Sequence, residues 1–172
     1  EEEPEVDWGA YQQELPEESG DQEEPPELPA AFALPYHRDH SLDPVTCGEG
    51  IQQDLASLIY EPLFRLDGNF EPVPVLCESC EWDDAGLVCT LRLREDALFQ
   101  DGSRVTAKDA AAALNRAAAS ERYGYRLRGM ASAAANRRGE LVVTLSAPDR
   151  GLPALLDIPV VKNGTQERTV PM

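Results

Sequence analysis

Histidine, the side chain that most often carries acid–base catalysis, is scarce in this chain of 172 residues. The chain has only two histidines, both in the run 36–40, and its aromatic content is 6%. There is no glycine-rich phosphate-binding loop, and no serine stands in the strand-to-helix turn that exposes a nucleophile. The paired acids Glu95-Asp96 and Asp83-Asp84 lie in predicted turns, where acidic residues form turns more often than acid–base couples. The sequence therefore argues against an enzyme.

Basic residues are missing from the first 28 positions, which hold 12 of the chain's 32 acidic residues. Residues 29–172 therefore carry 20 acidic and 15 basic side chains, a net charge of −5 out of the total of −17. The acidic segment has too few apolar side chains to offset the entropy of an ordered chain. We predict a disordered acidic tether over residues 1–40, suited to a lipid-anchored domain, although a plain solubility tail fits equally. The negative charge also argues against nucleic acid or anionic lipid as a partner.

The four cysteines, an even number, raise the question of metal binding or disulfides. Cys77 and Cys80 have the two-residue spacing of a zinc site. Structural zinc sites usually present a second close pair of ligands, and here only Cys89 and the distant Cys47 and histidines are available. We therefore favour disulfides or buried thiols over zinc.

A predicted hairpin brings two of these cysteines together. The run 81–87 (EWDDAGL) has the Asp and Gly residues of a tight turn between two strands. If Trp82 faces Leu87 across the turn, Cys80 faces Cys89, and a bridge between them would imply an oxidising compartment. Cys47 and Cys77 are the remaining candidates for a second disulfide, on the even count alone.

Hydrophobic periodicity predicts an α+β fold. Apolar residues recur at helical spacing over 51–61, before Pro62, and we expect this stripe to be buried. Residues 87–94 alternate strictly, as in a strand with one wet face. Thr106 caps a second helix that runs to about Ser120, and Asp109 completes the cap. A hairpin of 130–135 and 140–147, a short helix over 152–156 and a short strand over 158–161 follow. The result is a mostly antiparallel sheet, built from two hairpins, with helices packed against it.

The run 91–109 (LRLREDALFQDGSRVTAKD) resembles the signature of the family 5 extracellular solute-binding proteins. These are the receptors for peptides, dipeptides and nickel that serve ABC importers. Their pattern is a strand ending in Leu-Arg, a Phe-x-Asp-Gly turn, and Thr-Ala-x-Asp at the start of a helix. Further matching segments occur in the family's order: 42–44 (LDP), 59–63 (IYEPL), 66–68 (LDG), 141–145 (LVVTL) and 158–162 (IPVVK).

The resemblance covers about residues 42–172 and implies a fold. It makes residues 41–172 part of the first lobe of a periplasmic-binding-protein-like fold of class II. Cys77 and Cys80 stand where the family has Ala and Trp. Family members are much longer and clamp the ligand with a second lobe, so we expect either a part of a longer receptor or a degenerate relative.

The resemblance also implies a function, which is capture of a peptide or similar small solute outside the cytoplasm and its delivery to an ABC transporter permease. The protein would then lie at the extracellular face of the membrane or in the periplasm. In the family the ligand sits between the lobes, which makes Thr46, Gly48 and Glu49 the candidate ligand-binding residues. An ordinary loop is the competing interpretation of these three. A non-transport interaction module at the cell surface, which keeps only part of the fold, is the alternative function.

Metal and cofactor binding are the last sequence-level question. Because the family includes nickel receptors, His37 and His40 are possible ligands, but exposed histidines more often lie in solvated loops. We therefore predict neither a metal site nor a cofactor. Taken with the missing catalytic motifs, the sequence predicts an exported ligand-binding module.

Overall fold

The computed structural model of the chain describes residues 34–35, 40–48 and 50–166. His37 and Glu49 lie outside these residues, as does most of the predicted acidic tether. What was expected of them therefore stays a prediction. The contacts separate residues 1–34 from a folded unit that begins at Pro35, and the following paragraphs concern that unit.

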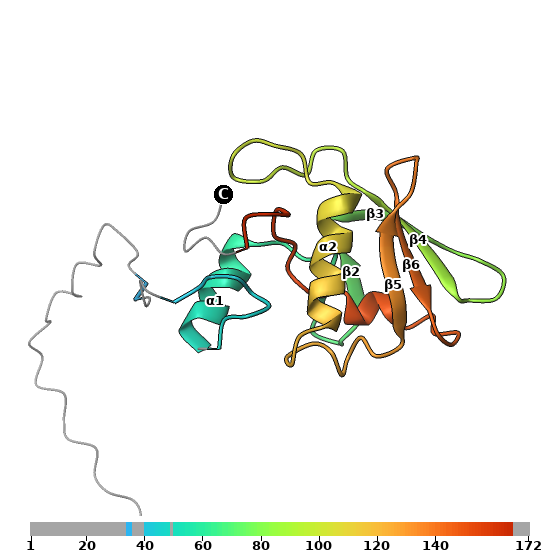
Figure 1. Cartoon of the computed structure of the whole chain (residues 1–172), viewed down its shortest axis with the longest axis horizontal. Helices are drawn as coiled ribbons and strands as arrows, with labels where there is room; N and C mark the ends of the chain where they lie inside the picture. The colour runs from blue at the N-terminus through green and yellow to red at the C-terminus, as the bar shows by residue number, and fades with distance from the viewer. Residues whose placement is uncertain (1–33, 36–39, 49, 167–172) are drawn as a thin grey trace, which may run out of the picture. The chain divides into compact units, whose positions relative to one another are not determined.

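A four-stranded antiparallel sheet with the order β3-β4-β6-β5 forms one layer of the fold (Figure 1). Its strands are β3 (Cys77–Trp82), β4 (Val88–Leu93), β5 (Met130–Ala135) and β6 (Leu141–Leu145). A separate ribbon pairs β1 (Phe64–Leu66) with β2 (Pro72–Pro74), and the 3₁₀ helix η2 (Leu152–Leu155) follows β6. The predicted α+β class and the two hairpins are confirmed.

The core lies between this sheet and α2 (Ala107–Ala118), which covers β5 and β6. Strict alternation in β4 and β6 sends one side of each strand inward, and Cys89, Leu91, Leu141 and Val143 have no exposed surface. The inward face of α2 consists mainly of small residues, which let the helix axis approach the sheet closely. Its buried members include Ala110, Ala113, Leu114 and Ala117.

The start of α2 forms as the sequence predicts. Thr106 is the N-cap residue, its hydroxyl oxygen accepts from the Asp109 amide, and the Asp109 carboxylate accepts from the Thr106 amide at 3.0 Å. These reciprocal bonds satisfy backbone donors that have no partner inside the helix.

One helix side chain also ties α2 to the edge of the sheet. The Asn115 amide donates to the carbonyl oxygen of Ala133 in β5 at 2.7 Å and accepts from the Ala133 amide at 3.1 Å. The position of α2 against β5 is therefore fixed by polar contacts as well as by apolar packing.

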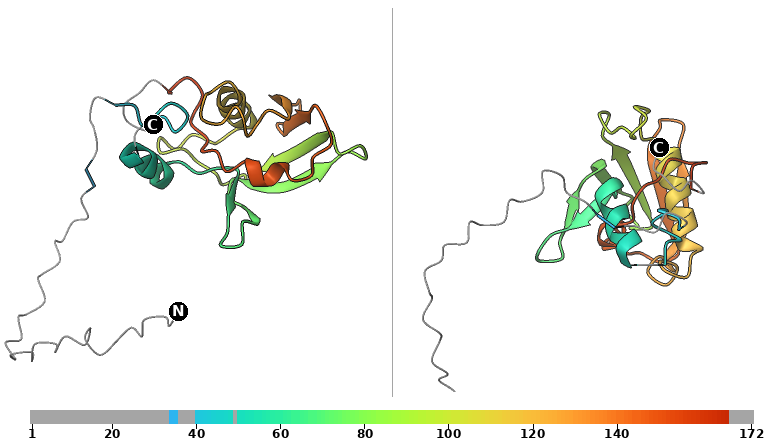
Figure 2. Two further views of the ribbon diagram at one scale, coloured as in Figure 1. Left: turned by 90° about the horizontal axis from the view of Figure 1, so that it is seen from below. Right: turned by 90° about the vertical axis from the view of Figure 1, so that its left-hand side faces the viewer.

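The helix predicted over 51–61 forms as α1 (Gly50–Ile59; Figure 2), but its buried face is not the expected one. Its buried residues are Gln52 and Ala56, and Ala56 packs with Tyr60 and Val161. Of the apolar stripe that was expected to be core, Leu58 is 71% exposed and Ile51 is 44% exposed. The prediction was wrong because the stripe was assigned by apolarity alone, whereas the neighbouring segments cover the face that carries Gln52.

Two further details of the prediction need correction. Trp82 pairs with Cys89 and not with Leu87, because the hairpin turn is longer than expected. Gly86 takes a φ of 68° in this turn, and the Asp83 carboxylate accepts from the amides of Leu87 and Val88 at 2.8 and 3.0 Å. Residues 158–161 do not form a strand, since only an isolated bridge joins Pro159 to Pro62.

Candidate functional site

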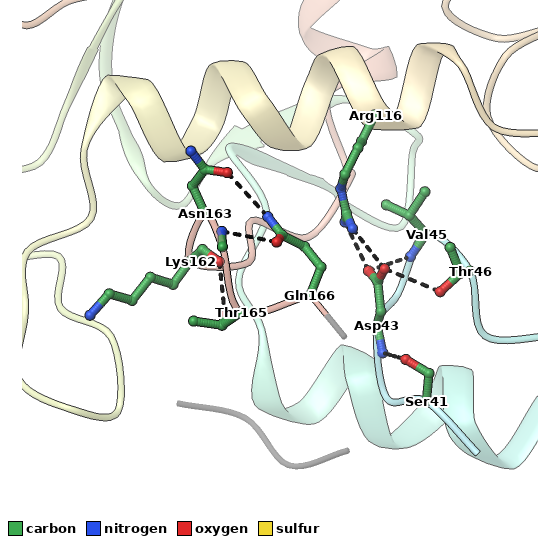
Figure 3. Close-up of polar contacts among 10 residues, drawn as sticks. Ser41, Asp43, Val45, Thr46, Arg116, Lys162, Asn163, Thr165 and Gln166 are labelled. Atoms are coloured by element: carbon green, nitrogen blue, oxygen red, sulfur yellow. Dashed lines mark hydrogen bonds and ion pairs between the residues drawn. The ribbon is translucent and has the colours of Figure 1, made fainter. Parts of the chain in front are cut away.

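The loop from Asp43 to Gly48, which contains two of the three predicted ligand-binding residues, is organised by the Asp43 side chain (Figure 3). The Asp43 carboxylate accepts from the Val45 amide at 3.2 Å and from the Thr46 hydroxyl at 3.1 Å. The Asp43 carbonyl oxygen accepts from the amides of Thr46 and Cys47 at 3.1 and 2.8 Å. Five consecutive residues therefore take one defined turn.

Arg116, in the last turn of α2, clamps this loop onto the helix (Figure 3). Its two terminal nitrogens donate to the two carboxylate oxygens of Asp43 at 2.7 and 2.9 Å, the planar two-point geometry that arginine favours. The Asp43 side chain is 3% exposed and that of Arg116 is 30% exposed. In the described part of the chain, Arg116 Nε is the buried side-chain nitrogen that lacks a partner. The loop is thus attached to α2 by a largely desolvated ion pair.

Three hollows adjoin the Asp43–Gly48 loop, and we call them together the loop groove. The first, of about 670 Å³, lies between this loop, Gln53 of α1 and the segment Ser120–Arg122 that follows α2. The second, of about 380 Å³, is bounded by Thr46, Gly48, His40 and Gln52. The third, of about 300 Å³, is bounded by Pro44, Ser57, Arg122, Tyr123, Arg126 and Asp157. Thr46 and Gly48 are exposed and line two of these hollows, and Glu49 lies outside the described residues.

Two arginines lie beside an aromatic ring in the loop groove, whose lining also holds the acidic side chains of Glu121 and Asp157. The guanidinium groups of Arg122 and Arg126 lie 5.1 and 5.8 Å from the centre of the Tyr123 ring, within the range of cation–π attraction. Arg126 also pairs with Asp157, whereas Arg122 lines both the first and the third hollow. Sequence reasoning missed Arg122. The run 122–128 (RYGYRLR), directly after a predicted helix end, was the signal that was available.

Cys47 is the cysteine of this loop, and the other three lie elsewhere. Burial raises the pKa of the Cys47 thiol, an effect that the nearby Arg122 guanidinium partly opposes. Cys77, Cys80 and Cys89 lie together on β3 and β4, where the sulfurs of Cys80 and Cys89 are 2.8 Å apart. Because Cys80 pairs with Leu91 and Cys89 with Trp82, the two thiols are diagonal neighbours and not direct partners. All four cysteines are unbonded, so no disulfide is present and the pairing stays a prediction.

A separate hollow of about 680 Å³ lies at the other end of α2. Five cationic side chains line it, those of Arg92, Arg94, Arg104, Lys108 and Arg138. Arg92 approaches Glu140 at 3.8 Å. This hollow contains none of the residues predicted to bind ligand, and we take the loop groove as the candidate site.

Metal-binding and membrane-spanning features can be assessed only over the residues that the structure describes. Within residues 34–35, 40–48 and 50–166, no group of three or more His, Cys, Asp or Glu side chains is arranged to hold a metal ion. None of the helices described there has the length and apolarity to cross a bilayer.

Sequence comparison finds similarity to a defined family. The pattern of the bacterial extracellular solute-binding proteins, family 5 (middle part), matches residues 71–168. The glutathione-binding protein GsiB of Escherichia coli strain K12 is 38% identical over 77 residues, which are 45% of this chain and 15% of that protein. The matched segment thus spans less than a fifth of the curated relative's length.

Structural comparison agrees with the sequence. Listeria monocytogenes OppA bound to peptide aligns with a TM-score of 0.61 and 24% identity, over 70% of this chain and 28% of that one. MoaA of A. tumefaciens R10, in complex with mannopinic acid, aligns with a TM-score of 0.65 and 26% identity, over 72% and 27% of the two chains. Both likenesses support the predicted periplasmic-binding-protein-like lobe.

Proposed function

Because this chain belongs to family 5 of the bacterial extracellular solute-binding proteins, we propose that it supplies a wall of the solute-binding site in the receptor of an ABC importer. The observation that carries the proposal is that the family pattern covers residues 71–168, while the predicted ligand-binding loop borders a groove in the same folded unit. The role is non-catalytic capture of a solute and its delivery to a membrane permease.

The proposed contacts follow from the chemistry of the loop groove. Thr46 offers a hydroxyl group, and Gly48 offers a backbone that a ligand can approach closely because no side chain intervenes. Glu49 remains the third candidate. Arg122 adds a guanidinium group, which binds a carboxylate through two parallel hydrogen bonds.

These groups favour a small peptide or a similar solute with a carboxylate. Glutathione, which GsiB binds, and the peptide bound to OppA belong to that chemical class. We propose the same class for this chain, without choosing among its members.

The proposed location is the extracellular face of the membrane or the periplasm, where disulfides persist. We propose that the acidic segment at residues 1–28 spaces the domain from a lipid anchor, since a chain of like charges is extended and self-repelling. The alternative of a non-transport surface module shares this location and differs in having no soluble ligand.

Nuclear magnetic resonance tests the proposal, because it detects weak binding residue by residue. The described groove is open, so half of the contacts of an enclosed site are missing and affinity should be millimolar or weaker. Titration of the full chain with a tripeptide pool should shift the amide signals of Thr46, Gly48 and Arg122. The Arg122→Gln variant should reduce the shifts, whereas Arg128→Gln, at an exposed arginine outside the groove, should not.

Two results would contradict the proposal. Shifts confined to the hollow around Arg104 and Lys108 would show that the binding wall is elsewhere. Micromolar affinity would show that the groove is not an open wall.

A further inference from the structure

Two thiols of the four-stranded sheet lie in contact with each other. The sulfurs of Cys80 in β3 and Cys89 in β4 are 2.8 Å apart, on the same face of two paired strands. Side chains that are aimed at each other in this way meet the main geometric requirement for a disulfide. Neither thiol belongs to the loop groove.

Access to the two sulfurs is unequal. Cys89 has no exposed surface and lies in the core between the sheet and α2. Cys80 is partly exposed and lies in β3, which is the first strand in the order of the sheet. A small reagent from solution therefore reaches Cys80 before it reaches Cys89.

The ionisation of the thiols follows the same asymmetry. The hydrogen bond from Cys89 lowers the pKa of the Cys80 thiol despite its partial burial, and the same bond together with burial raises the pKa of Cys89. Since the thiolate is the form that attacks a disulfide, Cys80 is the nucleophile of the pair.

Cys77 is the third thiol nearby, and its surroundings set it apart. It is 3% exposed, it donates to the Ser79 carbonyl oxygen at 3.2 Å, and burial raises its pKa to about 12. It lacks the access that attack on a disulfide from solution requires, and its thiol bonds to the Ser79 carbonyl oxygen instead of the Cys80 sulfur. The reactive pair is thus Cys80 and Cys89.

We propose that Cys80 is a site of thiol–disulfide exchange with low-molecular-weight disulfides, and that Cys89 resolves the adduct into a Cys80–Cys89 disulfide. In the first step the Cys80 thiolate attacks one sulfur of a disulfide RSSR, forms a Cys80–S–SR bond and releases RS⁻. In the second step Cys89 loses its proton to solvent, attacks the Cys80 sulfur and releases the second RS⁻. Two cysteine thiols are oxidised to one disulfide, RSSR is reduced to two thiols, and atoms and electrons balance.

The bridge would cross-link β3 to β4 beside the hairpin turn. The closed loop, residues 80–89, holds the turn that Asp83 and Gly86 shape. The exchange reaction requires neither the solute nor the family's transport role, so failure of one proposal leaves the other standing.

Mass spectrometry of the reduced full chain after treatment with 2-hydroxyethyl disulfide tests the proposal. The wild-type chain should lose two hydrogens and keep no adduct, with the bridge mapped to Cys80 and Cys89. Cys89→Ala, which keeps an apolar side chain in the core, should instead retain one hydroxyethylthio group on Cys80. Cys80→Ala should react at least tenfold more slowly at Cys89, whereas Cys77→Ala, the matched control, should bridge at the wild-type rate.

Circular dichroism of each variant checks that the sheet is retained before the rates are compared. Because the reacting form is the thiolate, the rate should fall as the pH is lowered below the pKa of Cys80. An adduct on Cys77 or Cys47 at a comparable rate, or a wild-type chain that accumulates the Cys80 adduct without bridging, would overturn the proposal. So would an unmodified Cys80 in the Cys89→Ala chain.

Discussion

The two ends of α2 are joined to the rest of the fold by buried aspartates, but the partners of those aspartates differ. At the C-terminal end, Asp43 comes from a distant loop and binds the Arg116 guanidinium. At the N-terminal end, Asp109 belongs to the helix itself and accepts from the Thr106 amide and hydroxyl. Its second oxygen accepts from the Asn163 amide at 3.0 Å.

The ion pair of Asp43 with Arg116 is a tertiary anchor, whereas the contacts of Asp109 form a mainly local anchor. Asp43 and Arg116 are 73 residues apart in sequence, and each charge depends on the other for its solvation. Asp109 would keep most of its contacts in an isolated helix, because Thr106 is only three residues away. The loop that carries the proposed ligand contacts therefore depends on the completed fold, whereas the cap of α2 does not.

Breaking the tertiary anchor should have the largest effect. Arg116→Met leaves the Asp43 carboxylate buried without a cation, and we expect a loss of about 3 kcal/mol in the free energy of unfolding. This is the low end of the range for buried pairs, because the Arg116 side chain is 30% exposed. Urea unfolding measures the loss. Arg128→Met, at an exposed arginine over the Tyr125 ring, is the control and should change little.

A double variant sharpens this test. Asp43→Asn combined with Arg116→Met removes both charges and should recover most of the lost stability, since no unpaired buried charge remains. A single variant that costs less than about 0.5 kcal/mol would contradict the view that this ion pair is desolvated.

Oxidation of the thiol pair is a change remote from both ends of α2. Closing the loop 80–89 should raise the free energy of unfolding by about 2–3 kcal/mol in the chain-entropy approximation. Urea unfolding of the oxidised and reduced chains gives the difference. Because the bridge shares no partner with either anchor, the costs of Arg116→Met and Asp109→Ala should be the same in both redox states. Unequal costs would show that β3 and β4 are coupled to α2 more strongly than the contacts indicate.

Breaking the local anchor should cost less than breaking the tertiary one. Asp109→Ala removes half of the capping box and the bond to Asn163, for an expected loss of about 1–2 kcal/mol. Asp109→Asn should restore part of it, because an amide oxygen still accepts from the Thr106 amide. Thermal unfolding followed by circular dichroism measures both, and a loss equal to that of Arg116→Met would erase the distinction between the two anchors.

An exposed ion pair should have the smallest effect. Arg94 binds Asp96 through both carboxylate oxygens at 3.0 and 2.8 Å, yet both side chains are largely exposed. The Arg94 hydrogen bond lowers the pKa of Asp96, so its stabilisation is full above the ordinary Asp pKa and is lost as the pH falls through the lowered value. Arg94→Gln should lower stability at neutral pH only slightly, because the pair is exposed, and should return the pKa of Asp96, followed by carbon-13 signals, toward its ordinary value. An Asp96 pKa that does not move would contradict the assigned cause.

Local patterns predicted the elements that local interactions determine. The cap at Thr106 and Asp109 was readable because both partners lie within one turn. The inward and outward sides of β4 were predictable because apolar and polar residues alternate along the strand. Thr46 and Gly48 were predicted as ligand-binding residues from a family resemblance; they line the loop groove, and their contact with a ligand stays a prediction.

Long-range contacts could not be predicted from the sequence. Nothing local indicated that Arg116 would reach Asp43, or that Arg122 would line the groove. The buried face of α1 was predicted wrongly because burial of Gln52 depends on which segment packs against it. The partner of Trp82 lies two positions further along the chain than predicted, because the Asp83 side chain stabilises a longer turn. Apolar and polar residues alternate with a period of two, so the pattern is the same in both registers.

The contact between Asn115 and Ala133 bears on self-association. A strand at the edge of a sheet presents free amide and carbonyl groups, and another chain can extend the sheet by pairing with them. At Ala133, in the terminal strand β5, both groups are already taken by the side-chain amide of Asn115. One helix residue thus stands in for a neighbouring strand and blocks the addition of a foreign strand at this point, a protection against aggregation that an alanine-rich strand would otherwise lack.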